Sequence, residues 1–211
     1  MYTILAQFNP ISLEEMHSVK LMNRTDTKFV TTMRQLKSLL EMARSQYYAQ
    51  EIDGVRASNY HTLYFDTGDT AMYRNHHNGH LTRQKVRIRT YSDSQQHFLE
   101  VKKKNNHRRT KKKRVETEYD DNAITDHTDF LEKYLWLDSN LLMPVIENKF
   151  RRITLVNKGL TERLTIDFDL EFRSVSNGRQ VKLDKIVIIE LKRDGLKPSP
   201  VLAMLNRLRI Q

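Results

Sequence analysis

Hydrophobic residues recur with a helical period in the first part of the chain. Residues 33–43 follow a pair of threonines and carry their apolar side chains on one face of an expected helix. Those apolar residues are Met33, Leu36, Leu39, Leu40 and Ala43. A shorter helix is expected over residues 13–21, because Ser12 and Glu15 have the spacing of a capping box. We expect a short strand over residues 28–30 between the two helices.

From residue 60 onward the hydrophobic pattern alternates, which is typical of strands with one buried face. The expected strands are 60–65, 72–77, 80–91, 96–104, 111–119, 145–156, 162–172 and 182–192. Asn78-Gly79 is a strong hairpin signal and is expected to join 72–77 to 80–91. A helical pattern over 123–142 contains the only tryptophan and is expected to end at Pro144. Strand density and turn spacing of this kind favour a closed barrel.

Charged residues gather on one face of several of these strands. The rows are Lys85, Arg87 and Arg89; Glu100, Lys102 and Lys104; Lys112, Arg114 and Glu116; Arg163, Thr165, Asp167, Asp169 and Glu171; Glu190 and Lys192. Same-face neighbours lie about 6.5–7 Å apart. Two like charges at that distance repel by about 2.4 kcal/mol at an effective dielectric constant of 20. Either these rows are solvated outer faces, or they point inward and a bound polyanion stabilises them.

We favour the inward orientation, because helices outside the barrel need apolar strand faces to pack on. The predicted fold class is therefore α+β: a closed eight-stranded antiparallel β tunnel with a polar, basic lumen and helices packed outside. We expect residues 1–211 to form a single domain, which is within the usual size range of one domain.

Composition narrows the possible functions. The chain has 36 Lys and Arg against 26 Asp and Glu, so its formal charge is +10 and a polyanionic partner is expected. It contains no cysteine, which excludes disulfides, thiol catalysis and zinc-thiolate sites. It has no GxxxxGK or GxGxxG motif, no apolar run long enough to span a bilayer and no secretion signal. We expect a cytoplasmic protein without direct membrane insertion.

Lysine, arginine and glutamate in one lumen suit phosphoryl transfer from a triphosphate. Arginine binds phosphate oxygens with two parallel hydrogen bonds, and lysine acts as a point charge on the β- and γ-phosphates. A carboxylate can hold Mg²⁺ or Mn²⁺ together with substrate oxygens and water. No covalent nucleophile is required, because such reactions depend on positioning and charge neutralisation.

Several short segments, in this order, resemble one known family. They are residues 24–30 (RTDTKFV), 64–67 (YFDT), 85–91 (KVRIRTY), 98–102 (FLEVK), 112–114 (KKR), 151–152 (RR), 163–167 (RLTID) and 189–192 (IELK). Together they resemble a bacterial member of the VTC domain (vacuolar transporter chaperone, polyphosphate polymerase) family. That family belongs to the triphosphate tunnel metalloenzyme superfamily, with the CYTH phosphatases and RNA triphosphatases. The resemblance covers nearly the whole chain.

The resemblance implies an enzyme that moves the γ-phosphate of ATP or another nucleoside triphosphate onto inorganic polyphosphate. The catalytic cations it implies are Lys28, Arg87, Arg89, Lys102, Arg152 and Arg163. Further substrate-binding cations are expected at Arg24, Lys85, Lys104, Lys112, Arg114 and Lys192. Glu190 is the implied ligand of Mn²⁺ or Mg²⁺, and Glu100 is a second candidate.

The sequence departs from the family pattern in three places. Phe150 stands where a tyrosine is expected, and Arg151-Arg152 leaves open which of the two arginines faces the tunnel. The Ser-Lys-Tyr-like segment expected after the last strand does not occur before Gln211. Coupling to export would need a membrane-protein partner, which would recruit the domain to the inner face of the membrane.

Two other functions compete with the polymerase. A tripolyphosphatase or nucleoside triphosphatase of the same fold would release phosphate without building chains. A non-catalytic polyphosphate-binding or polyanion-binding module would bind without turnover. A metal site at the histidines of 76–80, or a specific nucleic-acid site at the basic segment 107–114, is the weaker interpretation of each segment. A solvated hairpin tip or a tunnel mouth explains the basic segment better.

Overall fold

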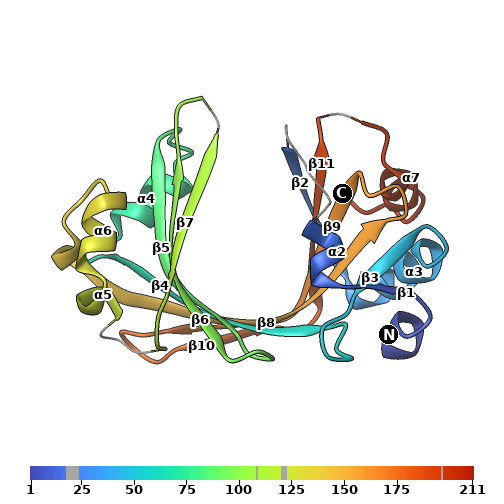
Figure 1. Cartoon of the computed structure of the whole chain (residues 1–211), viewed down its shortest axis with the longest axis horizontal. Coiled ribbons are helices and arrows are strands. Elements are labelled where there is room, and N and C mark those ends of the chain that lie inside the picture. Colours follow the sequence, from blue (N-terminus) through green and yellow to red (C-terminus); the bar gives the residue numbers. More distant parts are fainter. Residues whose placement is uncertain (18–23, 108, 120–122, 196) are drawn as a thin grey trace. The chain divides into compact units, whose positions relative to one another are not determined.

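The protein is described by a computed structural model that covers residues 1–17, 24–107, 109–119, 123–195 and 197–211 (Figure 1). The chain divides into two compact units. Unit 1 comprises Met1–Ser58, Phe150–Leu170 and Lys182–Gln211, and unit 2 comprises Asn59–Lys149 and Glu171–Val181.

Eleven strands and short helices make up the described chain. The helices are α1 (Tyr2–Leu5), α2 (Leu13–His17), α3 (Met33–Ala43), α4 (Ala71–His77), α5 (Ala123–Asp126), α6 (Thr128–Tyr134), the 3₁₀ helix η1 (Ser139–Leu141) and α7 (Pro200–Arg207). The strands are β1 (Asn9–Ile11), β2 (Arg24–Thr32), β3 (Tyr47–Gln50), β4 (Ser58–Thr67), β5 (Arg83–Tyr91), β6 (Gln96–Lys104), β7 (Thr110–Glu116), β8 (Leu142–Asn157), β9 (Glu162–Ser174), β10 (Gln180–Leu183) and β11 (Ile186–Asp194).

The strands form one sheet whose main path is β2-β11-β9-β8-β4-β5-β6-β7, with β1, β3 and β10 attached at its sides. The α+β class is confirmed, but the closed eight-stranded tunnel is not. Among the described residues the sheet has eleven strands and its path does not close on itself. Closure requires the two end strands to pair with each other, and the alternation within each strand does not specify that pairing.

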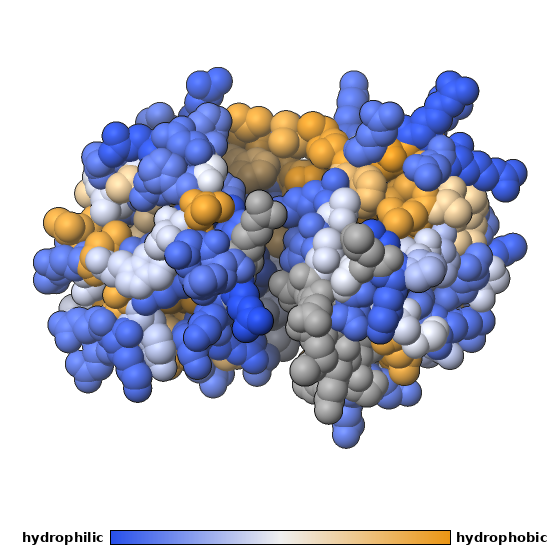
Figure 2. All heavy atoms as spheres, turned by 90° about the horizontal axis from the view of Figure 1, so that it is seen from above, coloured by the Kyte–Doolittle hydropathy of each residue, from blue (hydrophilic) through white to orange (hydrophobic). Residues whose placement is uncertain are grey.

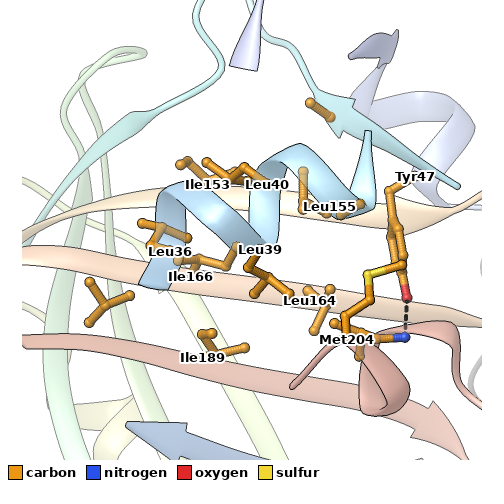
Figure 3. Packing of buried hydrophobic residues seen from close by; sticks show 14 of the residues in the cluster. Leu36, Leu39, Leu40, Tyr47, Ile153, Leu155, Leu164, Ile166, Ile189 and Met204 are labelled. Carbon is orange, nitrogen blue, oxygen red and sulfur yellow. Dashed lines mark hydrogen bonds between the residues drawn. The ribbon is translucent and has the colours of Figure 1, made fainter. Parts of the chain in front are cut away.

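The core of unit 1 lies between the sheet and two amphipathic helices. Leu36, Leu39 and Leu40 of α3 are fully buried against the apolar face of β8, β9 and β11 (Figure 3). The expected helix over 33–43 is confirmed, and Thr32 caps it by accepting a hydrogen bond from the Gln35 N–H. The C-terminal helix α7, which the sequence pattern did not predict, adds Met204 and neighbouring residues to this core.

Unit 2 repeats the arrangement with a different set of helices. Val86 and Ile88 of β5 and Leu99 and Val101 of β6 are buried in one cluster with Leu131 of α6. The remaining buried residues of this core come from β4, α4 and α5, together with Leu135 directly after α6. The apolar face of these strands therefore carries the helices, and the charged face is the opposite one.

The segment 71–77 is a helix, so the expected hairpin at Asn78-Gly79 is wrong. The buried carboxylate of Asp66 accepts hydrogen bonds from the N–H groups of Met72 (2.8 Å) and Tyr73 (2.9 Å), and so caps the first turn of α4. This cap comes from a residue six positions before Met72 and outweighs the turn signal at Asn78-Gly79, which depends only on the residues next to that turn.

Two further expectations need adjustment, and a third is confirmed in part. The helix predicted over 123–142 is divided into α5, α6 and η1, and Pro144 lies within β8 rather than ending the helix. The strand predicted over 182–192 is broken by a turn at residues 184–185 into β10 and β11. The capping box of α2 is confirmed, while residues 18–21 of that predicted helix lie outside the described residues. No helix in the described parts of the chain is long and apolar enough to cross a membrane.

Candidate phosphate-binding faces

The polar face of unit 2 is built from β5, β6 and β7. Their antiparallel register places Lys85 opposite Lys102, and Lys102 opposite Lys112, so three lysines form one row across three strands. The next row contains Arg87, Glu100 and Arg114. Directly opposed like charges destabilise a sheet, so such a row is suited to bind an anion.

One buried carboxylate organises this face. Both Arg87 Nε (2.8 Å) and Arg87 Nη2 (2.6 Å) donate to Glu100 Oε2, while Lys112 Nζ donates to Glu100 Oε1 at 2.7 Å. The Glu100 side chain is only 1% exposed. Burial alone would raise the pKa of Glu100, but the charges of Arg87 and Lys112 outweigh it and hold the pKa below its usual range.

Tyr64 belongs to the same face, although no role is predicted for it from the sequence. Its hydroxyl accepts a hydrogen bond from Arg87 Nη1 at 3.2 Å. Burial would raise the pKa of this hydroxyl, but Arg87, Arg89 and Lys85 outweigh that effect and lower the pKa. The alternation of Tyr60, Thr62 and Tyr64 against Leu63 and Phe65 was the sequence signal for this placement.

Aromatic and hydroxyl side chains support two other cations of this face. Arg89 Nε lies 3.4 Å from Thr62 Oγ1, and its guanidinium lies over the Tyr60 ring at 5.7 Å. The Arg114 guanidinium lies over the Phe98 ring at 4.4 Å. These contacts fix guanidinium groups without neutralising them.

The polar face of unit 1 is built from β2, β11, β9 and β8. Lys28 lies opposite Glu190, and Glu190 in turn lies opposite Thr165. Glu190 forms an ion pair with Lys192, and Lys192 Nζ also donates to Thr165 Oγ1 at 3.1 Å. Burial would raise the pKa of Glu190, but Lys192, followed by Lys28 and Arg152, lowers it. Burial lowers the pKa of Lys192, and the pair with Glu190 opposes this only in part.

Arg152, and not Arg151, belongs to this polar face. Its guanidinium binds Asp167 with two hydrogen bonds of 2.6 Å each. The Arg151 guanidinium lies on the apolar side of the sheet, 5.0 Å from the Tyr2 ring centroid and 5.8 Å from that of Phe168. This resolves the choice that the sequence left open, because adjacent residues of a strand point to opposite faces.

Acidic residues of β9 behave differently from one another. Asp167 neutralises Arg152, as just described. Asp169 has a φ of 53°, so the backbone is left-handed at this residue and the regular alternation ends there. Asp169 therefore does not extend the polar row that the sequence pattern placed along residues 163–171.

The remaining predicted cations are placed by the strand register. Arg163 lies opposite Lys192, and Lys104 lies opposite Arg83. The backbone of Arg24 pairs with Asp194, but its side chain lies outside the described part of the structure. Thus Lys28, Arg152, Arg163 and Lys192 come together in unit 1, and the other described cations of the prediction come together in unit 2.

The carboxylates present fit a divalent cation at Glu190 better than at Glu100. Both oxygens of Glu100 are already bound to cations, whereas Glu190 is 23% exposed and is paired on one oxygen with Lys192. Within the described residues there is no group of three or more His, Asp and Glu side chains that could hold a metal ion, including at the histidines of α4. A site at Glu190 would therefore be of the Mg²⁺ type, in which phosphate and water supply most ligands.

The family described as the VTC domain matches residues 23–211 of the chain. A search of curated proteins gives no match.

Several solved structures are similar to the chain at low sequence identity. The PH1012 protein from Pyrococcus horikoshii OT3 gives a TM-score of 0.48 at 11% identity, covering 89% of this chain and 91% of that one. A candidate adenylate cyclase from Vibrio parahaemolyticus gives 0.47 at 10% identity, covering 87% and 83%. A candidate adenylyl cyclase from Hippeastrum, described as having a dominant triphosphatase activity, gives 0.45 at 13% identity, covering 88% and 85%.

Proposed function

Because the chain belongs to the VTC domain family, we propose that it is a metal-dependent polyphosphate polymerase. It transfers the γ-phosphate of ATP or another nucleoside triphosphate onto the end of inorganic polyphosphate. We propose further that residues 1–211 act as one VTC-like domain.

The observation that carries this proposal is the row Lys85, Lys102 and Lys112 across β5, β6 and β7. Lys112 of this row shares the buried Glu100 with Arg87, and Arg89 lies on the same face, so lysines and arginines outnumber carboxylates on this face of β5, β6 and β7. A string of phosphates carries several negative charges along its length and can contact each of these cations. A single phosphate could not occupy the whole face.

The reaction needs no covalent intermediate. A terminal oxygen of the polyphosphate chain attacks the γ-phosphorus, the bond from that phosphorus to the β,γ-bridging oxygen breaks, and the nucleoside diphosphate leaves. Arg89 and Lys102 would neutralise phosphate oxygens on the unit 2 face. Lys28 and Arg152 would do the same on the unit 1 face. Arg87 is held in position by Glu100 and would bind phosphate without reorganising.

Glu190 is the residue proposed to hold the divalent cation, Mn²⁺ or Mg²⁺. A bound divalent ion would polarise phosphate oxygens and neutralise charge during transfer. The residues around Glu190 contribute separately: Lys192 and Thr165 keep its carboxylate oriented, and Lys28 supplies a further cation opposite it.

The direct test is incubation of the whole chain with ATP and Mn²⁺, followed by gel electrophoresis stained for polyphosphate. A ladder of chains that a polyphosphatase removes is the expected result. Release of orthophosphate without chains would contradict the polymerase proposal and indicate a triphosphatase. Saturable binding of short polyphosphate without formation of chains or orthophosphate would contradict the polymerase proposal and indicate a binding module.

Glu190→Gln separates metal-dependent turnover from phosphate binding. We expect tripolyphosphate affinity within about threefold of wild type and turnover reduced by about a hundredfold, a few kcal/mol of transition-state stabilisation. Asp184→Asn is the matched control, because it removes one exposed carboxylate from the turn between β10 and β11. Equal turnover in the two variants would contradict the metal role of Glu190.

A further inference from the structure

The β6–β7 hairpin of unit 2 has a second basic face, on the side opposite to the row of Lys102 and Lys112. Lys103 of β6 lies directly opposite Lys111 of β7, and Lys113 lies opposite Val101. Because side chains alternate along a strand, these three lysines share the side of Val101, which packs in the helix-covered core. They therefore lie at the edge of the helical layer and away from the proposed phosphate-binding face.

Aromatic side chains meet this second basic face. Lys103 Nζ lies 4.8 Å from the centroid of the Trp136 ring. Lys113 Nζ and Lys133 Nζ each lie 5.7 Å from the centroid of the Tyr134 ring. The resulting lysine–tryptophan patch consists of Lys103, Lys111, Lys113, Lys133, Tyr134 and Trp136.

The charge of this patch is not neutralised by the rest of the described protein. None of its four lysines forms an ion pair with a described carboxylate, although α6 also carries Asp129 and Glu132. Lys103 and Lys111 are directly opposed like charges, which destabilises an isolated sheet. Burial lowers the pKa of Lys103, in accord with its packing on the tryptophan ring.

Exposed apolar side chains occur in the same part of the sequence. Trp136 is 50% exposed, and Leu141 and Met143 follow it at 55% and 49% exposure. On the face drawn in Figure 2, hydrophobic residues gather in patches among a mostly hydrophilic surface. An exposed tryptophan in contact with Lys103, near a tyrosine that contacts two further lysines, combines the two features of a peripheral membrane-binding surface. These features are an amphipathic ring that can lie at headgroup depth and cations that can reach the lipid phosphates.

We propose that the lysine–tryptophan patch binds the surface of an anionic lipid bilayer. Single-stranded nucleic acid is less favoured, because base stacking needs an open ring face and Lys103 lies over the Trp136 ring. The binding is peripheral and involves no spanning segment. This inference goes beyond the proposed polymerase activity and does not depend on it.

The protein contains its own reporter, because Trp136 is the only tryptophan. The whole chain is titrated with vesicles of phosphatidylcholine and with vesicles that also contain phosphatidylglycerol, while tryptophan emission and co-sedimentation are followed. We expect a blue shift and sedimentation with the anionic vesicles only, and loss of both on raising the salt concentration to about 0.5 M. No shift with anionic vesicles, or an equal shift with neutral ones, would overturn the proposal.

The double variant Lys103→Gln/Lys113→Gln localises the effect. Each lysine near an anionic surface contributes about fivefold to binding, so vesicle affinity should fall about 25-fold. The matched control is Lys158→Gln/Lys185→Gln, which removes the same charge from exposed turns of unit 1. If both double variants lose the same vesicle affinity, the binding depends on the net charge of the protein and not on this patch, and the assignment is overturned.

Nucleic acid is tested with the same reporter. A single-stranded oligonucleotide that changes Trp136 emission at lower concentration than the vesicles, and that competes with them, would replace the bilayer by nucleic acid as the ligand. Polyphosphate synthesis is not part of any readout here. The proposal therefore stands or fails separately from the proposed function.

Discussion

The polar faces of the two units hold crowded cations in different ways. In unit 1, Arg152 pairs with Asp167 and Lys192 pairs with Glu190, so these two cations each have a carboxylate of their own. The Arg152 and Asp167 side chains are each 18% exposed. In unit 2, Arg87 and Lys112 share Glu100, which is 1% exposed.

The difference in burial distinguishes a carboxylate that can change its partner from a carboxylate that holds its cations in place, and the sequence alone does not distinguish these two roles. A partly exposed pair can exchange partners at little cost, because water replaces the lost contact. A buried carboxylate with two cations cannot lose one partner without leaving an uncompensated charge in the interior. Under the proposed function, Glu190 would therefore exchange a lysine contact for a metal ion, whereas Glu100 would keep its cations in position for phosphate.

The largest effect that would test this comparison comes from Glu100→Gln. The variant leaves Arg87 and Lys112 without their carboxylate, so we expect unit 2 to lose about 3–5 kcal/mol of stability. Urea-induced unfolding followed by circular dichroism measures the change. Asp167→Asn is the partly exposed counterpart in unit 1 and should cost about 1 kcal/mol. Equal costs would show that the two faces do not differ as described.

The same pairing affects the choice of binding variants. Removing Arg87 would leave Glu100 buried with one cation only, so loss of phosphate binding in Arg87→Ala would be mixed with loss of stability. Arg89→Ala leaves the Arg87–Glu100 and Lys112–Glu100 ion pairs in place, and it removes a guanidinium that contacts Thr62 and the Tyr60 ring. It is the better probe of phosphate contact on this face.

The second effect is a loss of stability in acid. The pKa values of both Glu100 and Glu190 are lowered in the folded protein. A carboxylate of lowered pKa binds fewer protons folded than unfolded. Its contribution is therefore complete above the unfolded pKa of about 4.3 and is lost as pH falls through the folded value. We expect the free energy of unfolding to fall below about pH 5.

Comparing variants assigns this acid sensitivity to one face or the other. Glu100→Gln should flatten the dependence of unfolding free energy on pH more than Glu190→Gln does, because Glu100 is deeply buried and bound to two cations. Unfolding midpoints measured between about pH 3 and pH 7 provide the comparison. A greater flattening in Glu190→Gln would reverse the ranking of the two carboxylates.

Which face of each strand is charged could be predicted from the sequence, because alternation is a local property of the chain. The placement of Arg87 and Lys102 on one face and of Val86 and Val101 on the other is confirmed. The same holds for the helix over 33–43, whose leucines fill the core of unit 1.

The predictions that were wrong, and the choices that the sequence left open, depended on contacts that the hydrophobic pattern and the turn signals do not describe. The helix α4 is capped by Asp66, which a turn signal at Asn78-Gly79 does not reveal. The choice between Arg151 and Arg152 required the exact phase of β8, and the sharing of Glu100 by two cations required the register of three strands. The failure of the sheet to close concerns its end strands, and no local pattern describes their pairing.

The smallest expected effect is a gain in stability, whereas the variants above lower the stability of the protein. Lys104 lies directly opposite Arg83 on the polar face of unit 2, so the two like charges repel across the β5–β6 pair. Lys104→Gln removes one of them and should stabilise the protein without ligand by about 0.2–0.5 kcal/mol. The same change should weaken tripolyphosphate binding, because it removes a cation from the face. Urea unfolding and isothermal titration measure the two effects, with Lys158→Gln as the control in unit 1. If Lys104→Gln destabilises the protein, cation crowding on this face costs nothing, and the strongest argument that it is built for a phosphate chain is lost.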